Sequence, residues 1–105
     1  MKQIPDYPDY YVTEDGQVWS HKYRSPRLRK SFLSNQGYDR VVLCKDGRPV
    51  GYDVHRLVAL TYIDNPDNKP QVHHINEDKL DNRVDNLMWV TDLENKQLGT
   101  KHFKR

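Results

Sequence analysis

The sequence predicts a single small α+β domain in which an antiparallel β-region is followed by a helix and then by a strand–loop–strand–helix unit. Its 105 residues suit one domain. β-branched and aromatic runs separated by turn residues fill the first half, which is typical of hairpins. The most apolar segment with helical spacing begins at Val54. We therefore divide the domain into a basic, β-rich region, residues 1–53, and a helix with the C-terminal unit, residues 54–105.

Composition limits the core and indicates the compartment. Hydrophobic residues make up 35% of the chain and charged residues 30%, so a few aromatic anchors must carry much of the packing. Cys44 is the only cysteine, which excludes an internal disulfide and a cysteine zinc site and fits a reducing cytoplasm. The N-terminal stretch lacks the apolar core of a signal peptide, and no apolar run approaches the roughly 20 residues that span a bilayer. We expect a cytoplasmic protein without a membrane partner.

Turn residues place the strands of the first half. The stretch "YYVTEDGQVWS" predicts a hairpin that turns around Glu14, Asp15 and Gly16. Residues 28–33 predict one short strand, and residues 38–45 predict a longer one because they are rich in β-branched residues. The turn in "DGRPVGY" then lets residues 50–54 pair back with the longer strand. These strands form an antiparallel region that carries a basic run.

The next segment predicts the central helix. Val54, Leu57 and Val58 recur at helical spacing. Asp53 can cap the first turn, and the prolines of "DNPDNKP" cannot continue the helix. Because this is the most apolar helix of the chain, we expect the other elements to pack against it. For His55, near its start, we favour a structural role over a catalytic one.

A strand, a loop, a second strand and a helix follow in that order. Residues 71–74 and 86–90 predict the two strands, and the Asn- and Asp-rich loop between them can bond its own backbone. Thr91 and Glu94 form the T-x-x-E pattern of a capping box, which marks a helix start. Gly99 can end this helix. Asn95 then falls in its first turn.

The net charge is only +2, but it is unevenly distributed. Residues 20–35 contain basic side chains and no acid, whereas the acids gather between residues 64 and 94. This separation predicts a polyanion at the first segment and a cation at the second. A solvated loop or a charge-guarded edge strand is the alternative for the basic run, and we favour phosphate contact. The candidate contacts are Lys22, Arg24, Arg27, Arg29 and Lys30.

The adjacent histidines of "VHHIN" should have different roles, because His73 and His74 point to opposite faces of a strand. One imidazole nitrogen and the amide oxygen of Asn95, brought together across the hairpin, suit a divalent cation with several open positions. The other imidazole can take a proton from water near pH 7. A pair of histidines alone means little, but its spacing to Asn86 and Asn95 strengthens the interpretation. A cation and a base beside a basic surface predict a phosphodiester hydrolase.

The segment "VHHINEDKLDNRVDNLMWVTDLEN" resembles the catalytic motif of the HNH endonucleases, which share the ββα-metal fold. It is most similar to the motif of phage and intron-encoded HNH homing endonucleases. "YYVTEDGQVWS" resembles their N-terminal module, and the segment from "VHRLVAL" to "NKP" resembles the helix that leads into the motif. The resemblance covers residues 7–95, and its linked blocks make it specific. It implies a metal-dependent DNA endonuclease that nicks or cuts both strands and leaves 5′-phosphate and 3′-hydroxyl ends.

The resemblance also implies roles for single residues. His74 would be the general base, and His73 and Asn95 would be the protein ligands of one divalent metal ion. Mg²⁺ or Mn²⁺ is the first choice, with Ni²⁺ and Zn²⁺ as further candidates. Asn86 would be the middle asparagine, which bonds backbone across the loop and helps to hold the base. Asn82 would be structural.

Two departures from the family pattern affect these roles. His73 stands where many relatives have Asp, which lowers the negative charge at the metal and favours Mn²⁺, Ni²⁺ or Zn²⁺ over Mg²⁺. Glu77 stands where relatives often have Gly, so a positive φ there would be strained. Homing relatives often add a helical DNA-reading region, whereas this chain ends in the basic stretch "KHFKR", which could touch phosphate. We therefore expect low intrinsic sequence specificity.

The expected partner is double-stranded DNA, with monomer and homodimer both open. If the chain is phage-encoded, the compartment is the cytoplasm of the host cell. One alternative function is a DNA-binding module without catalysis, in which the His/Asn site is structural. Another is a structural zinc site built from two histidines and other ligands, against which the lack of cysteine partners counts.

Overall fold

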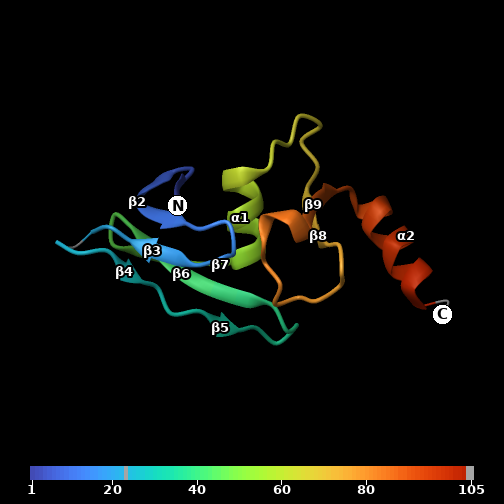
Figure 1. Cartoon of the computed structure of the whole chain (residues 1–105), viewed down its shortest axis with the longest axis horizontal. Coiled ribbons are helices and arrows are strands. Elements are labelled where there is room, and N and C mark those ends of the chain that lie inside the picture. The colour runs from blue at the N-terminus through green and yellow to red at the C-terminus, as the bar shows by residue number, and fades with distance from the viewer. Residues whose placement is uncertain (23, 104–105) are drawn as a thin grey trace.

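The computed structural model describes residues 1–22 and 24–103, with side chains described up to residue 97 apart from residue 23. Within these residues, three small antiparallel sheets and two α-helices form an elongated molecule (Figure 1). The first sheet contains β1 (Lys2–Ile4), β2 (Tyr7–Val12), β3 (Val18–Ser20) and β4 (Arg27–Leu28). The second contains β5 (Phe32–Leu33), β6 (Asp39–Lys45) and β7 (Arg48–Asp53). After α1 (Val54–Tyr62) come β8 (Gln71–His74), the 3₁₀ turn η1 (Val84–Asn86), β9 (Leu87–Val90) and α2 (Asp92–Phe103).

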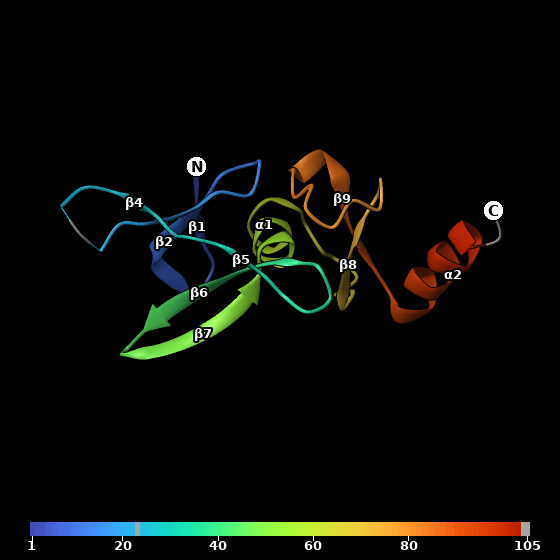
Figure 2. The same ribbon diagram turned by 90° about the horizontal axis from the view of Figure 1, so that it is seen from below.

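Helix α1 lies at the centre of the molecule, between the two N-terminal sheets and the β8–β9 hairpin (Figure 2). Its inner face is completely buried, with Leu57 at 1% and Val58 at 0% exposure. These side chains join a core to which the strands of both N-terminal sheets contribute, for example Val12 and Leu43. The helical spacing of apolar residues therefore predicted the central element correctly. Among the described residues, no helix is long and apolar enough to cross a membrane.

The hairpin predicted around Gly16 is confirmed, because β2 and β3 pair with Tyr11 opposite Trp19. The prediction of one strand over residues 28–33 is wrong. β4 ends at Leu28 and belongs to the first sheet, whereas β5 begins at Phe32 and belongs to the second. Arg29 fixes the crossing point, because its amide donates to the Val18 carbonyl at 2.7 Å and its guanidinium to the Val42 carbonyl at 3.2 Å.

The helix ends follow the predictions only in part. Asp53 occupies the N-cap position of α1, but its carboxylate makes no capping bond and pairs with Arg40 at 3.2 Å. The predicted capping box of α2 is present: the Thr91 amide donates to Glu94 at 2.9 Å, and the Glu94 amide donates to the Thr91 hydroxyl at 3.1 Å. Gly99 does not end α2, which continues to Phe103. A glycine costs only about 1 kcal/mol inside a helix, so it need not stop one.

Candidate active site at the β8–β9 hairpin and α2

The two histidines of β8 lie on opposite faces of the hairpin, as predicted. His73 pairs with Met88 and is half-buried, whereas His74 pairs with Leu87 and is only 5% exposed. The His74 ring packs against α1, with its centroid 4.6 Å from that of His55. Tyr38, which precedes β6, stacks on both imidazoles, at 5.0 Å from His55 and 6.0 Å from His74. His74 therefore faces the interior, and His73 faces the other side.

One ring nitrogen of His74 is committed to the loop. Its Nε2 lies 2.8 Å from Oδ1 of Asn82, a residue that is also buried, at 5% exposure. A carbonyl oxygen can only accept, so Nε2 carries the hydrogen and Nδ1 keeps a lone pair. A lone pair on a neutral imidazole is what a general base requires.

Asn86 clamps the loop between β8 and η1. Its Oδ1 accepts from the Asn76 amide at 3.0 Å, and its Nδ2 donates to the Asn76 side chain and to the Asp81 carbonyl, both at 2.9 Å. The prediction that Asn86 bonds backbone across the loop is confirmed. The structure places its hydrogen bonds on the loop, and Asn82 next to Asp81 holds the His74 ring. Any support that Asn86 gives to His74 therefore passes through the loop.

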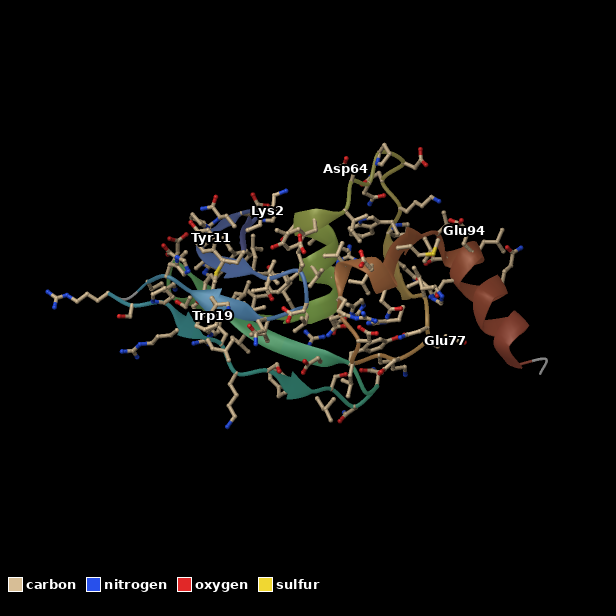
Figure 3. All side chains as sticks on the ribbon, in the orientation of Figure 1. Lys2, Tyr11, Trp19, Asp64, Glu77 and Glu94 are labelled. Carbon is tan, nitrogen blue, oxygen red and sulfur yellow. The ribbon has the colours of Figure 1, made fainter. Side chains whose placement is uncertain are left out.

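The loop also contains the strained residue that the sequence suggested. Glu77 has a φ of 64°, in the left-handed region that favours glycine. It lies on the outside of the turn that follows β8 (Figure 3), and its amide donates to the His74 carbonyl at 2.9 Å. Asn76 and Asp78 bond the amides two residues ahead of them, at 2.9 and 3.0 Å. These local bonds explain why an Asn- and Asp-rich stretch keeps one conformation.

Asn95 lies beside the face of β8 that carries His73. Its Nδ2 donates to Oε1 of Gln71 at 2.6 Å, and Gln71 shares a strand face with His73, two residues later. The capping box fixes the start of α2, where Glu94 lies (Figure 3), directly after β9. Lys69 pairs with Glu94 at 3.1 Å. The hydrogen bond from Asn95 to Gln71 uses the side-chain nitrogen of Asn95. It therefore leaves the side-chain carbonyl oxygen of Asn95, the atom that would bind a cation, available.

The chemistry of these two side chains fits a divalent cation. Partial burial lowers the pKa of His73, and the nearby His74 lowers it further while Glu77 opposes the shift. A neutral imidazole and an amide oxygen can both donate electron pairs to a metal ion. No group of three or more His, Cys, Asp or Glu side chains that could hold a metal ion occurs in the described part of the chain. The structural zinc site therefore gains no support from the described residues.

His55, for which sequence reasoning favoured a structural role over a catalytic one, packs directly against the His74 ring. It is 8% exposed, and its Nδ1 is buried without a hydrogen-bond partner among the described residues. Burial, and secondarily the neighbouring His74, lowers the pKa of His55 to about 4. Tyr38 was not predicted to take part at all. The position of His55 one residue into α1 was visible in the sequence, but its contact with His74 is a tertiary contact.

The predicted phosphate contacts are spread over the loop after β3 and the crossing to the second sheet. Lys22 donates to the Cys44 carbonyl at 2.8 Å, and Arg29 is half-buried in its bond to Val42. The other three, Arg24, Arg27 and Lys30, are exposed. The loop lies at one end of the longest dimension, 51 Å, and α2 lies at the other (Figure 1). The side chains of the tail "KHFKR" lie outside the described residues.

Comparisons with known proteins agree with this geometry. Residues 52–97 match the family model described as HNH endonuclease. A mimivirus HNH endonuclease, L247, is 63% identical over 101 residues. The H-N-H endonuclease F-TflII of Escherichia phage T5 is 33% identical over 98 residues, and the DNA endonuclease I-HmuI of Bacillus phage SP01 is 35% identical over 95 residues. The match covers about nine-tenths of this chain in each case, 91%, 91% and 90%.

A solved structure shows the same fold. It describes DNA binding and cleavage by the HNH homing endonuclease I-HmuI and superposes with a TM-score of 0.88 at 30% sequence identity. The superposition covers 99% of this chain and 59% of that one. The chain spans 25% of L247, 50% of F-TflII and 53% of I-HmuI, so each of these relatives contains sequence that this chain does not match.

Proposed function

Because the chain belongs to the HNH endonuclease family, we propose that it is a metal-dependent DNA endonuclease in which His74 is the general base. The observation that carries the proposal is the state of the His74 ring, whose Nε2 is bonded to Asn82 and whose Nδ1 is left to accept a proton. The base lies on a strand whose other face carries His73, near Asn95. A proton acceptor and a cation site on one short hairpin suit hydrolysis of a phosphodiester.

His73 and Asn95 would hold the divalent cation, which would supply positive charge against the developing charge on the phosphate. The protein residues do the rest. Nδ1 of His74 takes a proton from the attacking water, while Asn82 keeps the hydrogen on Nε2. Tyr38 and His55 cover the ring and keep bulk water from it. Mn²⁺, Ni²⁺ or Zn²⁺ should serve at least as well as Mg²⁺, because the ligand set is an imidazole and an amide without a carboxylate.

Basic side chains of the β-region would hold the DNA. Lys22, Arg24 and Lys30 are exposed. With five to seven phosphate contacts, the affinity should fall steeply between low and moderate salt, with log Kd changing about 0.9 units per contact for each log unit of salt. A molecule 51 Å long can follow about 15 base pairs at roughly 3.4 Å each. Phosphate contacts of this kind place the protein without reading sequence, so we expect weak sequence preference and a partner of double-stranded DNA.

The test is nicking of a supercoiled plasmid with Mg²⁺, Mn²⁺ or EDTA. His74→Asn should lower the nicking rate by about a hundredfold or more, as expected for loss of a general base, while the Kd in a gel shift changes little. Asn68→Asp is the control, because Asn68 is exposed in the loop between α1 and β8. If His74→Asn nicks at the parental rate with circular dichroism unchanged, the assigned base is wrong.

One observation favours a second candidate, a DNA-binding module without catalysis. His74 is only 5% exposed, so its Nδ1 must reach water or phosphate from a nearly closed position. In that case the His/Asn site would join the hairpin to α2 and α1 and do no chemistry. Gel-shift binding without nicking in any of the three conditions would favour this module, and EDTA-sensitive nicking would exclude it.

A further inference from the structure

Asn82 lies outside the motif positions to which the family resemblance gives a chemical role. It makes the 2.8 Å hydrogen bond to Nε2 of His74, and both side chains are 5% exposed. The aromatic faces of His55 and Tyr38 also pack against the His74 ring, at centroid distances of 4.6 and 6.0 Å. These faces pack on the ring but do not determine which of its nitrogens carries the hydrogen. Asn82 is therefore positioned to determine the tautomer of His74.

The side-chain oxygen of Asn82 can only accept a hydrogen bond, so its contact with Nε2 requires a hydrogen on Nε2. A free imidazole exchanges between its two neutral tautomers, and a fixed acceptor at one nitrogen removes one of them. Without Asn82, part of the molecules would place the hydrogen on Nδ1, where it blocks proton acceptance. The bond also fixes the rotation of the ring about its Cβ–Cγ bond.

Three contacts hold Asn82 and the residues beside it. Gly16, at a φ of +93° in the turn of the β2–β3 hairpin, packs so closely that a Cβ atom there would lie 3.0 Å from Cβ of Asn82. The amide of Val84, two residues after Asn82, donates to the Glu14 carbonyl of the same turn at 2.8 Å. On its other side, the Asp81 carbonyl accepts from the Asn86 side chain. The N-terminal hairpin and the loop clamp therefore fix Asn82 from both directions.

We infer that Asn82 is a positioning residue for His74, which sets the Nε2–H tautomer and aims Nδ1, and that the turn at Gly16 supports it. The inference rests on the proposed function, in which His74 is the base. In this inference, a tertiary contact made by residues 13–17 contributes to the chemistry proposed for residues 73–95. Asn86 then acts one step further away, through the loop that carries Asn82.

The first readout does not depend on activity. Long-range ¹H–¹⁵N spectra at a pH where the imidazoles are neutral report which ring nitrogen is protonated, and His74→Asn identifies the His74 signals. The wild-type protein should show the Nε2–H pattern, and Asn82→Leu should show a mixture of tautomers. Asn82→Asp keeps an accepting oxygen and should retain the Nε2–H pattern. A wild-type spectrum with the hydrogen on Nδ1 would overturn the inference, and so would an unchanged pattern in Asn82→Leu.

The second readout is the single-turnover nicking rate at saturating protein, with the Kd for DNA measured in parallel. Loss of an orienting partner typically costs tenfold to a hundredfold in activity. Asn82→Leu should therefore lose tenfold to a hundredfold in rate with Kd within about twofold, Asn82→Asp should recover most of the rate, and Asn68→Asp should match the wild type. Equal rates for Asn82→Leu and the wild type would refute the positioning role.

Gly16→Ala tests the support from the hairpin turn without changing any residue of the loop, because the added Cβ would press on Cβ of Asn82. We expect a smaller loss of rate than in Asn82→Leu, together with a shift of the His74 signals. If Asn82→Leu fails to fold, the wild-type spectrum and the Asn82→Asp variant still decide the assignment. If the wild type shows the Nε2–H pattern but nicks no DNA with any metal, the positioning contact stands and the proposed nuclease function fails.

Discussion

The neutral, buried His55 predicts how stability should change in mild acid. His55 is 8% exposed, and burial, with a smaller contribution from the neighbouring His74, lowers its pKa from 6.5 to about 4. The unfolded chain therefore binds the proton at a higher pH than the folded protein does. The stability that neutral His55 contributes is complete above pH 6.5 and is lost as the pH falls towards about 4. A difference of about 2.5, from 6.5 minus 4, corresponds to about 3 kcal/mol at most, at roughly 1.4 kcal/mol for each pKa unit.

The matched variant is His55→Phe, which keeps a flat ring against Tyr38 and cannot titrate. Nδ1 of His55 is buried without a partner among the described residues, so Phe loses no hydrogen bond at that atom. Urea unfolding at a series of pH values between 7.5 and 4.5 gives the free energy of unfolding of both proteins. The wild type should lose up to about 3 kcal/mol more than the variant over this range. The other titrating groups, His73 included, are common to both proteins and cancel in the difference. Parallel curves would show that His55 is not held neutral by the fold.

Three further predictions concern the core, the loop and the strained turn. Leu57→Ala should lower the free energy of unfolding by about 2–5 kcal/mol, because the side chain is 1% exposed, whereas Leu60→Ala on the same helix, 45% exposed, should cost much less in the same urea titration. Asn86→Ala should remove the loop clamp, which hydrogen exchange would detect as faster exchange of loop amides, and unchanged protection would refute the clamp. Glu77→Gly should raise the melting temperature, because it relieves about 1 kcal/mol of backbone strain at the positive φ of residue 77. Glu77→Ala should not raise it, because alanine keeps the Cβ. Equal gains in both variants would show that the lost charge, and not the backbone strain, is responsible.

Local signals in the sequence predicted those parts of the fold that neighbouring residues determine. The turn at Gly16, the helix that begins at Val54 and the capping box at Thr91 each depend on residues within a few positions, and each is present. The strand over residues 28–33 failed because Arg29 bonds to two strands that are distant in sequence. The side chain of Asp53 does not cap α1 because Arg40 on a neighbouring strand takes its carboxylate.

The candidate site shows the same division. The opposite orientations of His73 and His74 follow from strand geometry, and the position of Asn95 follows from the capping box. The partner of His74 could not be predicted, because Asn82 is one of several asparagines in the loop and only the folded loop selects it. The roles of His73, His74, Asn86 and Asn95 in catalysis stay predictions.

The contacts of the His74 ring extend beyond the segment that carries the motif. The family match covers residues 52–97, yet the His74 ring is packed by Tyr38, and its partner Asn82 is held by the turn at Gly16. Both contacts come from the β-rich half, residues 1–53. The boundary between residues 1–53 and 54–105 therefore reflects composition, whereas residues on both sides of it contact the candidate site. The β8–β9 hairpin and α2 alone bring Asn95 to the face of β8 that carries His73, whereas the His74 ring is packed by Tyr38 from the β-rich half and by His55 of α1.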